Sequence, residues 1–219
     1  MSNDREIAWA AAGAACAALV EDGMRVGLGT GRAANAGIVA LGERVRSEGL
    51  HIIGVATSER SEAAAREAGI PTGPPGQPLD LAFDGADAID PRGLCVKGAG
   101  GAMVRERVLA ESAPRFLVLV DAPKIVASLD EWGILPLAVV PFAADRVSDQ
   151  LADLAPTRRD ELSDDGMVLI DLHPSAGADW QAVATRARAL PGVLDHGLFT
   201  LVLDDVLVGH PDGSVTSPA

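Results

Sequence analysis

Apolar runs alternate with helix-forming segments along the first 120 residues. Short apolar stretches predict strands over residues 24–28, 51–56, 79–83, 94–96 and 115–120. Proline-free segments rich in strong helix formers predict helices over residues 4–20, 33–47, 61–68 and 102–111. The strand runs are apolar throughout rather than alternating with polar residues. We therefore expect a parallel sheet with both of its faces covered.

The pattern changes after Trp132-Gly133. Strand-like runs over residues 135–140, 167–172 and 197–203 are interleaved with helical runs over residues 143–154 and 179–190. Two helices among a few strands favour a small α+β sandwich of the split βαβ kind. The apolar C-terminal segment 206–215 is expected to return to the first sheet.

These patterns predict an α/β protein with two domains. The first is a Rossmann-like parallel-sheet domain formed by residues 1–132 and 205–219. The second is a smaller ferredoxin-like α+β domain over residues 133–204.

The composition argues against several kinds of partner. A net charge of −13 and no block of basic residues disfavour nucleic acid, because the chain repels a polyanion. The most apolar N-terminal stretch, residues 7–20, is shorter than the ~20 residues that cross a bilayer, so no membrane partner is expected. A small anionic ligand remains compatible with an acidic chain if a few donors surround it locally.

The cysteines favour neither a disulfide nor a zinc site. Cys16 and Cys95 lie far apart in sequence, without a CxxC motif or a histidine at ligand spacing. We expect reduced thiols and a cytoplasmic protein.

Polar residues follow most of the predicted strands of the first domain. In open α/β sheets, ligands bind beyond the carboxyl ends of the strands, where such residues converge. Only two of the 18 basic residues are lysines, and both belong to this set. The set comprises Gly29-Thr30-Gly31-Arg32, Thr57-Ser58, Asp84-Gly85-Ala86-Asp87, Lys97-Gly98-Ala99-Gly100 and Asp121 with Lys124.

The first glycine loop differs from a dinucleotide-binding fingerprint. Arg32 occupies the third glycine position, and no acidic residue follows the second strand at Ala56. Glycines before a helix expose backbone N–H groups to an anion, which favours a phosphate site. The alternative is a tight strand-to-helix turn that binds nothing.

Three carboxylates are candidates for chemistry. Asp84 and Asp87 follow a buried strand and must be solvated, paired or protonated, and Lys97 is placed to neutralise them. Taken alone, they also fit a helix cap and a solvated loop acid. Glu106 lies nine residues after Lys97 on a predicted helix, where an ordinary surface role is the alternative. A partly dry glutamate near other carboxylates would have a raised pKa suited to moving protons.

In chain order, these motifs resemble those of ribose-5-phosphate isomerase of type A. The matching stretches include Gly27-Leu-Gly-Thr-Gly31, Asp84-Gly-Ala-Asp87, Lys97-Gly-Ala-Gly-Gly-Ala102, Arg105-Glu106 and Asp121-Ala-Pro-Lys124. The Asp-Gly-Ala-Asp and Lys-Gly-x-Gly motifs, with a glutamate nine residues after the lysine, are the specific part of this match.

The resemblance implies an aldose–ketose isomerase without cofactor or metal. It would interconvert D-ribose 5-phosphate and D-ribulose 5-phosphate through a cis-enediolate, in the non-oxidative branch of the pentose phosphate pathway. Glu106 would carry the proton between C2 and C1, while Asp84, Asp87 and Lys97 would handle the hydroxyls, ring opening and enediolate charge. The implied substrate-binding residues are Thr30, Gly31, Arg32, Ala33, Gly85, Ala86, Gly98, Ala99, Gly100 and Lys124. Family members are homodimers or homotetramers, and the smaller domain is the candidate for oligomerisation.

The chain departs from the family pattern at the residues that the resemblance assigns to phosphate binding. Arg32 and Ala33 replace a serine and a threonine whose hydroxyls bind phosphate, and Trp9 lies near the place where a lysine is usual. Arg32 either grips the phosphate bidentately or points to solvent. Two alternatives therefore stay open: an isomerase of another sugar or sugar phosphate, and a non-catalytic sugar-phosphate sensor. Trp9, Trp132 and Trp180 are expected to serve in packing.

Overall fold

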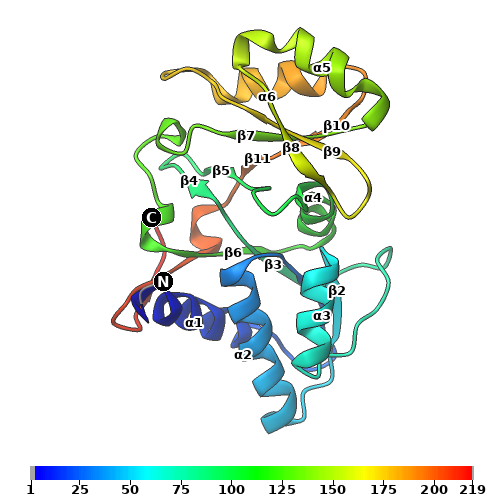
Figure 1. Ribbon diagram of the computed structural model, residues 1–219. Coiled ribbons are helices and arrows are strands. Elements are labelled where there is room, and N and C mark those ends of the chain that lie inside the picture. The colour runs from blue at the N-terminus through cyan, green and yellow to red at the C-terminus, as the bar shows by residue number, and fades with distance from the viewer. Residues whose placement is uncertain (1–2, 219) are drawn as a thin grey trace. The chain divides into compact units, whose positions relative to one another are not determined.

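The structure is a computed structural model that describes residues 3–218, and the chain divides into two compact units (Figure 1). Unit 1 comprises the chain up to residue 86, residues 105–124 and the chain from residue 202 onward. Unit 2 comprises residues 87–104 and 125–201. The limits predicted at residues 132 and 205 differ from these, because the structure groups residues 87–104 and 125–132 with unit 2 and residues 202–204 with unit 1.

Unit 1 contains a six-stranded sheet in the order β13-β12-β6-β3-β1-β2. Its strands are β1 (Arg25–Leu28), β2 (Ile53–Ala56), β3 (Leu81–Gly85), β6 (Phe116–Asp121), β12 (Val206–Gly209) and β13 (Val215–Thr216). All neighbours are parallel except the terminal pair, β12 and β13. The predicted parallel sheet is confirmed, and so is the return of the C-terminal segment, since β12 pairs with β6.

Helices cover both faces of this sheet. They are α1 (Asn3–Ala17), α2 (Arg32–Glu48), α3 (Glu59–Glu67) and α4 (Met103–Ser112). Phe83 and Leu119 of the sheet share one buried core with Ile38 of α2, while Ala82 on the other face packs with Leu109 of α4. Small residues let α1 and α2 approach closely, because a Cβ on Gly13 would lie 2.7 Å from the Ala36 carbonyl carbon.

Unit 2 contains a four-stranded antiparallel sheet in the order β10-β7-β9-β8. Its elements are β7 (Leu135–Val139), α5 (Ala144–Gln150), β8 (Thr157–Leu162), β9 (Val168–Leu172), α6 (Trp180–Arg188) and β10 (Val193–His196). This succession and strand order are those of a ferredoxin-like split βαβ unit, which confirms the predicted class. The sequence pattern missed β8, because its residues are mostly polar and exposed.

A second, three-stranded sheet in unit 2 supports the Lys97 loop. It consists of β4 (Ala88–Ile89), β5 (Leu94–Val96) and β11 (Leu198–Thr200), all antiparallel, in the order β11-β5-β4. This pairing is why residues 87–104 group with unit 2. The described part of the chain also contains five short 3-10 helices: η1 (Ala122–Lys124), η2 (Leu129–Glu131), η3 (Pro141–Ala143), η4 (Ala152–Leu154) and η5 (Leu203–Asp205). Within residues 3–218, none of the helices combines the length and apolarity needed to span a membrane.

Candidate functional site

Asp84 anchors the glycine loop of unit 1. Its side chain is buried at the end of β3, and its Oδ1 accepts hydrogen bonds from the backbone N–H of Thr30 at 2.9 Å and of Gly85 at 2.7 Å. A Cβ on Gly29 would lie 2.2 Å from the same oxygen, so only glycine fits at that position. The carboxylate therefore fixes the backbone of the turn between β1 and α2.

Hydroxyl groups join this turn to the next one along the sheet. The Thr30 hydroxyl lies 2.8 Å from that of Thr57 and donates to that of Ser58 at 2.7 Å. Ser58 in turn caps α3 in a reciprocal capping box with Ser61. The two strand-to-helix turns thus form one hydrogen-bonded polar surface.

The N-terminus of α2 presents backbone donors at this surface. Gly31 precedes the helix with φ +107°, a conformation that favours glycine, and contributes no side-chain cap. The first N–H groups of a helix and its dipole together attract anions. Of the other predicted residues here, Ala33 is buried, whereas Gly85 and Ala86 are half-buried.

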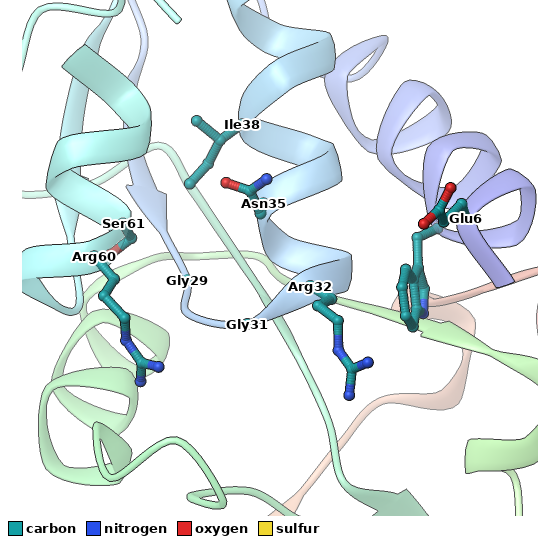
Figure 2. A pocket seen from close by; sticks show the side chains of 9 residues that line it. Glu6, Gly29, Gly31, Arg32, Asn35, Ile38, Arg60 and Ser61 are labelled. Atoms are coloured by element: carbon teal, nitrogen blue, oxygen red, sulfur yellow. The ribbon is translucent and has the colours of Figure 1, made fainter. Parts of the chain in front are cut away.

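A cavity of about 480 Å³ lies beside the glycine loop (Figure 2). Figure 2 shows Arg32 and Arg60 extending from α2 and α3 on either side of Gly31. The remaining lining residues are Glu6, Trp9, Gly29, Asn35, Ile38 and Ser61. Sequence reasoning missed Arg60, whose only signal is its place in the first turn after the Ser58 cap.

Trp9 holds cations at this cavity. The guanidinium carbons of Arg5 and Arg32 lie 5.0 and 5.1 Å from the centroid of its ring, within cation–π range. The predicted packing role is confirmed, since Trp9 is buried in the core of unit 1. The position where relatives were expected to carry a lysine therefore keeps positive charge nearby, supplied by two arginines.

The indole of Trp9 is itself held by Asp121 at the end of β6. Trp9 Nε1 donates to Asp121 Oδ1 at 3.1 Å, and Arg5 Nε donates to Oδ2 at 2.7 Å. Burial alone would raise the pKa of Asp121, but the hydrogen bonds from Arg5 and Trp9 outweigh burial and lower this pKa below its ordinary value.

Lys97 begins the second glycine-rich loop, which lies in unit 2. The residue is 2% exposed, and its Nζ lies 5.7 Å from the ring centroid of Phe199. Its backbone N–H donates to the Gly197 carbonyl at 2.8 Å. The next residue, Gly98, has φ +103°, and a Cβ there would lie 2.9 Å from the Met103 side chain.

The loop after Lys97 also binds a second predicted residue. The N–H of Ala99 donates to Asp87 Oδ2 at 2.9 Å. Ala99 and Gly100 are exposed, and Asp87 is half-buried. Within unit 2 the structure thus brings together Asp87 and the Lys97-Gly98-Ala99-Gly100 loop.

Glu106 and Lys124 belong to unit 1. Glu106 lies in the first turn of α4 and is 3% exposed, which excludes the surface role that a helical glutamate ordinarily has. Lys124 ends the short helix η1 directly after β6 and is half-buried.

The acids and thiols of the described residues form no candidate metal site. Residues 3–218 contain no group of three or more His, Cys, Asp or Glu side chains that could hold a metal ion. Cys16 and Cys95 are both buried and neither forms a disulfide, and burial raises the pKa of the Cys16 thiol to about 12, so this thiol stays protonated.

Comparison with known proteins identifies close relatives. The family model for ribose 5-phosphate isomerase A (phosphoriboisomerase A) matches residues 53–213. The chain is 43% identical to the ribose-5-phosphate isomerase A of Thermomicrobium roseum, with 90% of this chain and 87% of that protein aligned. It is 41% identical to that of Methanosarcina acetivorans, with 94% and 91% aligned.

Solved structures agree with the sequence comparison. Ribose 5-phosphate isomerase A from Methanocaldococcus jannaschii superimposes with a TM-score of 0.88 at 32% identity, covering 95% of this chain and 97% of the other. A D-ribose-5-phosphate isomerase in complex with phospho-erythronic acid superimposes with a TM-score of 0.89 at 28% identity, covering 99% and 100%.

Proposed function

Since the chain belongs to the ribose 5-phosphate isomerase A family, we propose that it interconverts D-ribose 5-phosphate and D-ribulose 5-phosphate in the non-oxidative branch of the pentose phosphate pathway. The observation that carries this proposal is the burial of Lys97 and Glu106, which are 2% and 3% exposed. Removing such groups from water costs several kcal/mol per ion before compensation. A catalytic requirement accounts for that cost.

Glu106 is the proposed base. In the open-chain aldose, its carboxylate removes the proton from C2, the C2–H electrons form the C1–C2 double bond of a cis-enediolate, and the carbonyl oxygen at C1 gains negative charge. A proton also passes from the C2 hydroxyl to the C1 oxygen, and return of the proton held by Glu106 to C1 then leaves the carbonyl at C2 and a hydroxyl at C1. One carboxylate that reaches both carbons is enough for the carbon-to-carbon transfer, and no redox cofactor is consumed.

Lys97 is the proposed donor to the enediolate oxygens. Its ammonium is a compact point charge, and one well-placed donor at a developing oxyanion contributes ~3 kcal/mol. Asp84 and Asp87 are proposed to exchange protons with the sugar hydroxyls during ring opening. Both are oriented by backbone N–H groups, Asp84 by Thr30 and Gly85, and Asp87 by Ala99.

The phosphate is proposed to bind at the N-terminus of α2. Thr30, Gly31, Arg32 and Ala33 supply backbone and side-chain donors there, and a phosphorylated ligand, phospho-erythronic acid, occupies one solved relative. We add Arg60, which lines the same cavity as Arg32. Lys124 is a further proposed substrate ligand. Gly85, Ala86, Gly98, Ala99 and Gly100 have small or no side chains, and their backbones are proposed to approach the sugar closely.

Turnover of ribose 5-phosphate tests the proposal. Purified protein with a chelator present should form ribulose 5-phosphate, and Glu106→Gln should lose this activity while Glu111→Gln, at an exposed position of the same helix, retains it. No turnover by the wild type would refute the proposed function. Thermal stabilisation by ribose 5-phosphate without turnover would indicate a sensor, and turnover of a different sugar with none of ribose 5-phosphate would indicate another isomerase.

We further propose that the protein acts in the cytoplasm as a homodimer or homotetramer that associates through unit 2. Unit 2 exposes large apolar side chains, including Phe142, which is fully exposed, with Leu162 and Leu194. Light scattering checks this proposal, and a monomer at micromolar concentration would contradict it.

A further inference from the structure

Arg159, on β8 of unit 2, has no role in the proposal above, yet its side chain binds the loop that follows Lys97. Its Nη1 donates to the carbonyl oxygens of Gly98 at 2.9 Å and Ala99 at 3.1 Å. Its Nε and Nη2 donate to the two carboxylate oxygens of Asp171 on β9, at 2.9 and 2.6 Å. The Asp171 carboxylate fixes the edge of the planar guanidinium that carries Nε and Nη2. Because the guanidinium is rigid, its Nη1 is directed at the loop.

The peptide bond between Gly98 and Ala99 is held at both ends. Its carbonyl accepts from Arg159, and its N–H, which points the opposite way in a trans peptide, donates to Asp87 Oδ2 at 2.9 Å. The next carbonyl, of Ala99, also accepts from Arg159, so the N–H of Gly100 points away from the guanidinium. The Gly101 N–H also donates to the Gly98 carbonyl at 3.0 Å. Arg159 and Asp87, together with this backbone turn, therefore hold two successive peptides, and of these groups only Arg159 binds both carbonyls.

We propose that Arg159, held by Asp171, is a positioning residue for the isomerisation. It orients the peptides on either side of Ala99 and, through the Ala99 N–H, the carboxylate of Asp87. This inference rests on the proposed function, in which Asp87 and the loop contact the sugar. A loop whose peptides are oriented before the substrate binds pays no reorganisation cost when charge develops.

A purely structural role for Arg159 explains less of what is observed. A cross-strand ion pair between β8 and β9 needs only the contact with Asp171, whereas Arg159 also makes two bonds to loop carbonyls. Arg158, the neighbouring residue on β8, makes a single ion pair of 3.8 Å with Asp145, and its side chain is 54% exposed. Arg158 therefore provides a control of the same charge on the same strand.

Steady-state kinetics of four variants test the inference. Arg159→Met should lower kcat by about 10- to 100-fold and change KM by less than about 3-fold, because misplaced catalytic groups lose transition-state stabilisation more than binding. Arg159→Lys should lose less, since an ammonium can bind one carbonyl. Asp171→Asn, which keeps Arg159 but loosens its anchor, should lower kcat by about 10-fold, and Arg158→Met should match the wild type.

Two results would overturn the inference: a kcat within about 2-fold of the wild type in folded Arg159→Met, or an equal loss in Arg158→Met. Thermal unfolding identifies variants that do not fold. If Arg159→Met does not fold, the kcat values of folded Asp171→Asn and Arg159→Lys test the inference instead. An unchanged kcat in both variants would overturn it.

Amide hydrogen exchange supplies a readout that does not depend on turnover. Without substrate, the amides of Ala99 and Gly100 should exchange faster in Arg159→Met than in the wild type, and Arg158→Met should leave them unchanged. An active wild type whose loop amides and kcat are insensitive to Arg159→Met overturns this inference alone. A wild type without isomerase activity overturns the proposed function, and the catalytic role of Arg159 with it.

Discussion

The guanidinium of Arg32 lies 5.1 Å from the centre of the Trp9 ring. Arg32 is exposed, and Trp9 is buried and hydrogen-bonded to Asp121. Arg32 is therefore held beside the glycine loop by a rigid aromatic surface. The contact between Arg32 and Trp9 leads to two tests of the proposed phosphate site.

Replacing Arg32 should weaken binding more than catalysis. A hydrogen bond to a charged group contributes ~1.5–3 kcal/mol, so Arg32→Ser should raise KM for ribose 5-phosphate by about 10-fold or more with kcat nearly unchanged. Arg66→Ser, at an exposed position of α3, should leave both parameters unchanged. Equal KM values for the wild type and Arg32→Ser would show that Arg32 does not bind the phosphate.

Trp9 should affect the binding of ribose 5-phosphate indirectly, because its ring holds the Arg32 guanidinium. Trp9→Phe keeps an aromatic surface but loses the bond to Asp121, whereas Trp9→Leu loses both and should destabilise the fold by ~3 kcal/mol. Trp9→Leu should also raise KM by about 3-fold, which corresponds to an exposed cation–π contact. The KM effects of Trp9→Leu and Arg32→Ser should be less than additive in the double variant. Strict additivity would mean that the two residues act independently.

Lys97 should not tolerate an arginine. The side chain is 2% exposed and lies against Phe199, so a larger planar group must either displace its neighbours or leave the donor position. Lys97→Arg should lower kcat by about 100-fold or more, the loss expected for one oxyanion donor. The KM for ribose 5-phosphate should change much less. A variant with near-normal kcat would remove Lys97 from the proposed chemistry.

The lowered pKa of Asp121 predicts how acid affects stability. Hydrogen bonds from Arg5 and Trp9 lower its folded-state pKa below the unfolded value of 3.8, so its contribution to stability is present above that pH and is lost as the pH falls through the folded-state value. Asp121→Asn should be less stable than the wild type at pH 7 and lose less stability between pH 5 and acid. Urea unfolding at a series of pH values measures both, and parallel pH profiles would contradict the prediction.

How far the sequence predicted the structure depends on whether a feature is local. The non-alternating apolar runs predicted the parallel sheet, because strands buried on both faces leave that signal in a single segment. The polar strand β8 left no such signal. The pairing of β5 with β11 depends on residues far apart in sequence, which is why the grouping of residues 87–104 was not predicted.

The candidate site also combines local features, which the sequence predicted, with long-range features, which it did not. Motif positions such as Asp84, Lys97 and Glu106 were identified because short segments carry them. Arg60, which lines the cavity beside the glycine loop, and Arg159, which binds the loop after Lys97, come from neighbouring elements and belong to no motif. Only the folded chain shows that they lie beside the loops.

Transfer of solvent deuterium to the sugar tests the central claim, that Glu106 moves the proton between C2 and C1, most directly. In D₂O, wild-type protein equilibrated with ribose 5-phosphate should introduce deuterium at C2 of ribose 5-phosphate and C1 of ribulose 5-phosphate, to the extent that the enzyme-bound proton exchanges with solvent before it returns. Glu106→Gln should reduce both this exchange and turnover by at least about 100-fold, the loss expected without a general base. Exchange and turnover at wild-type rates in Glu106→Gln would contradict the account.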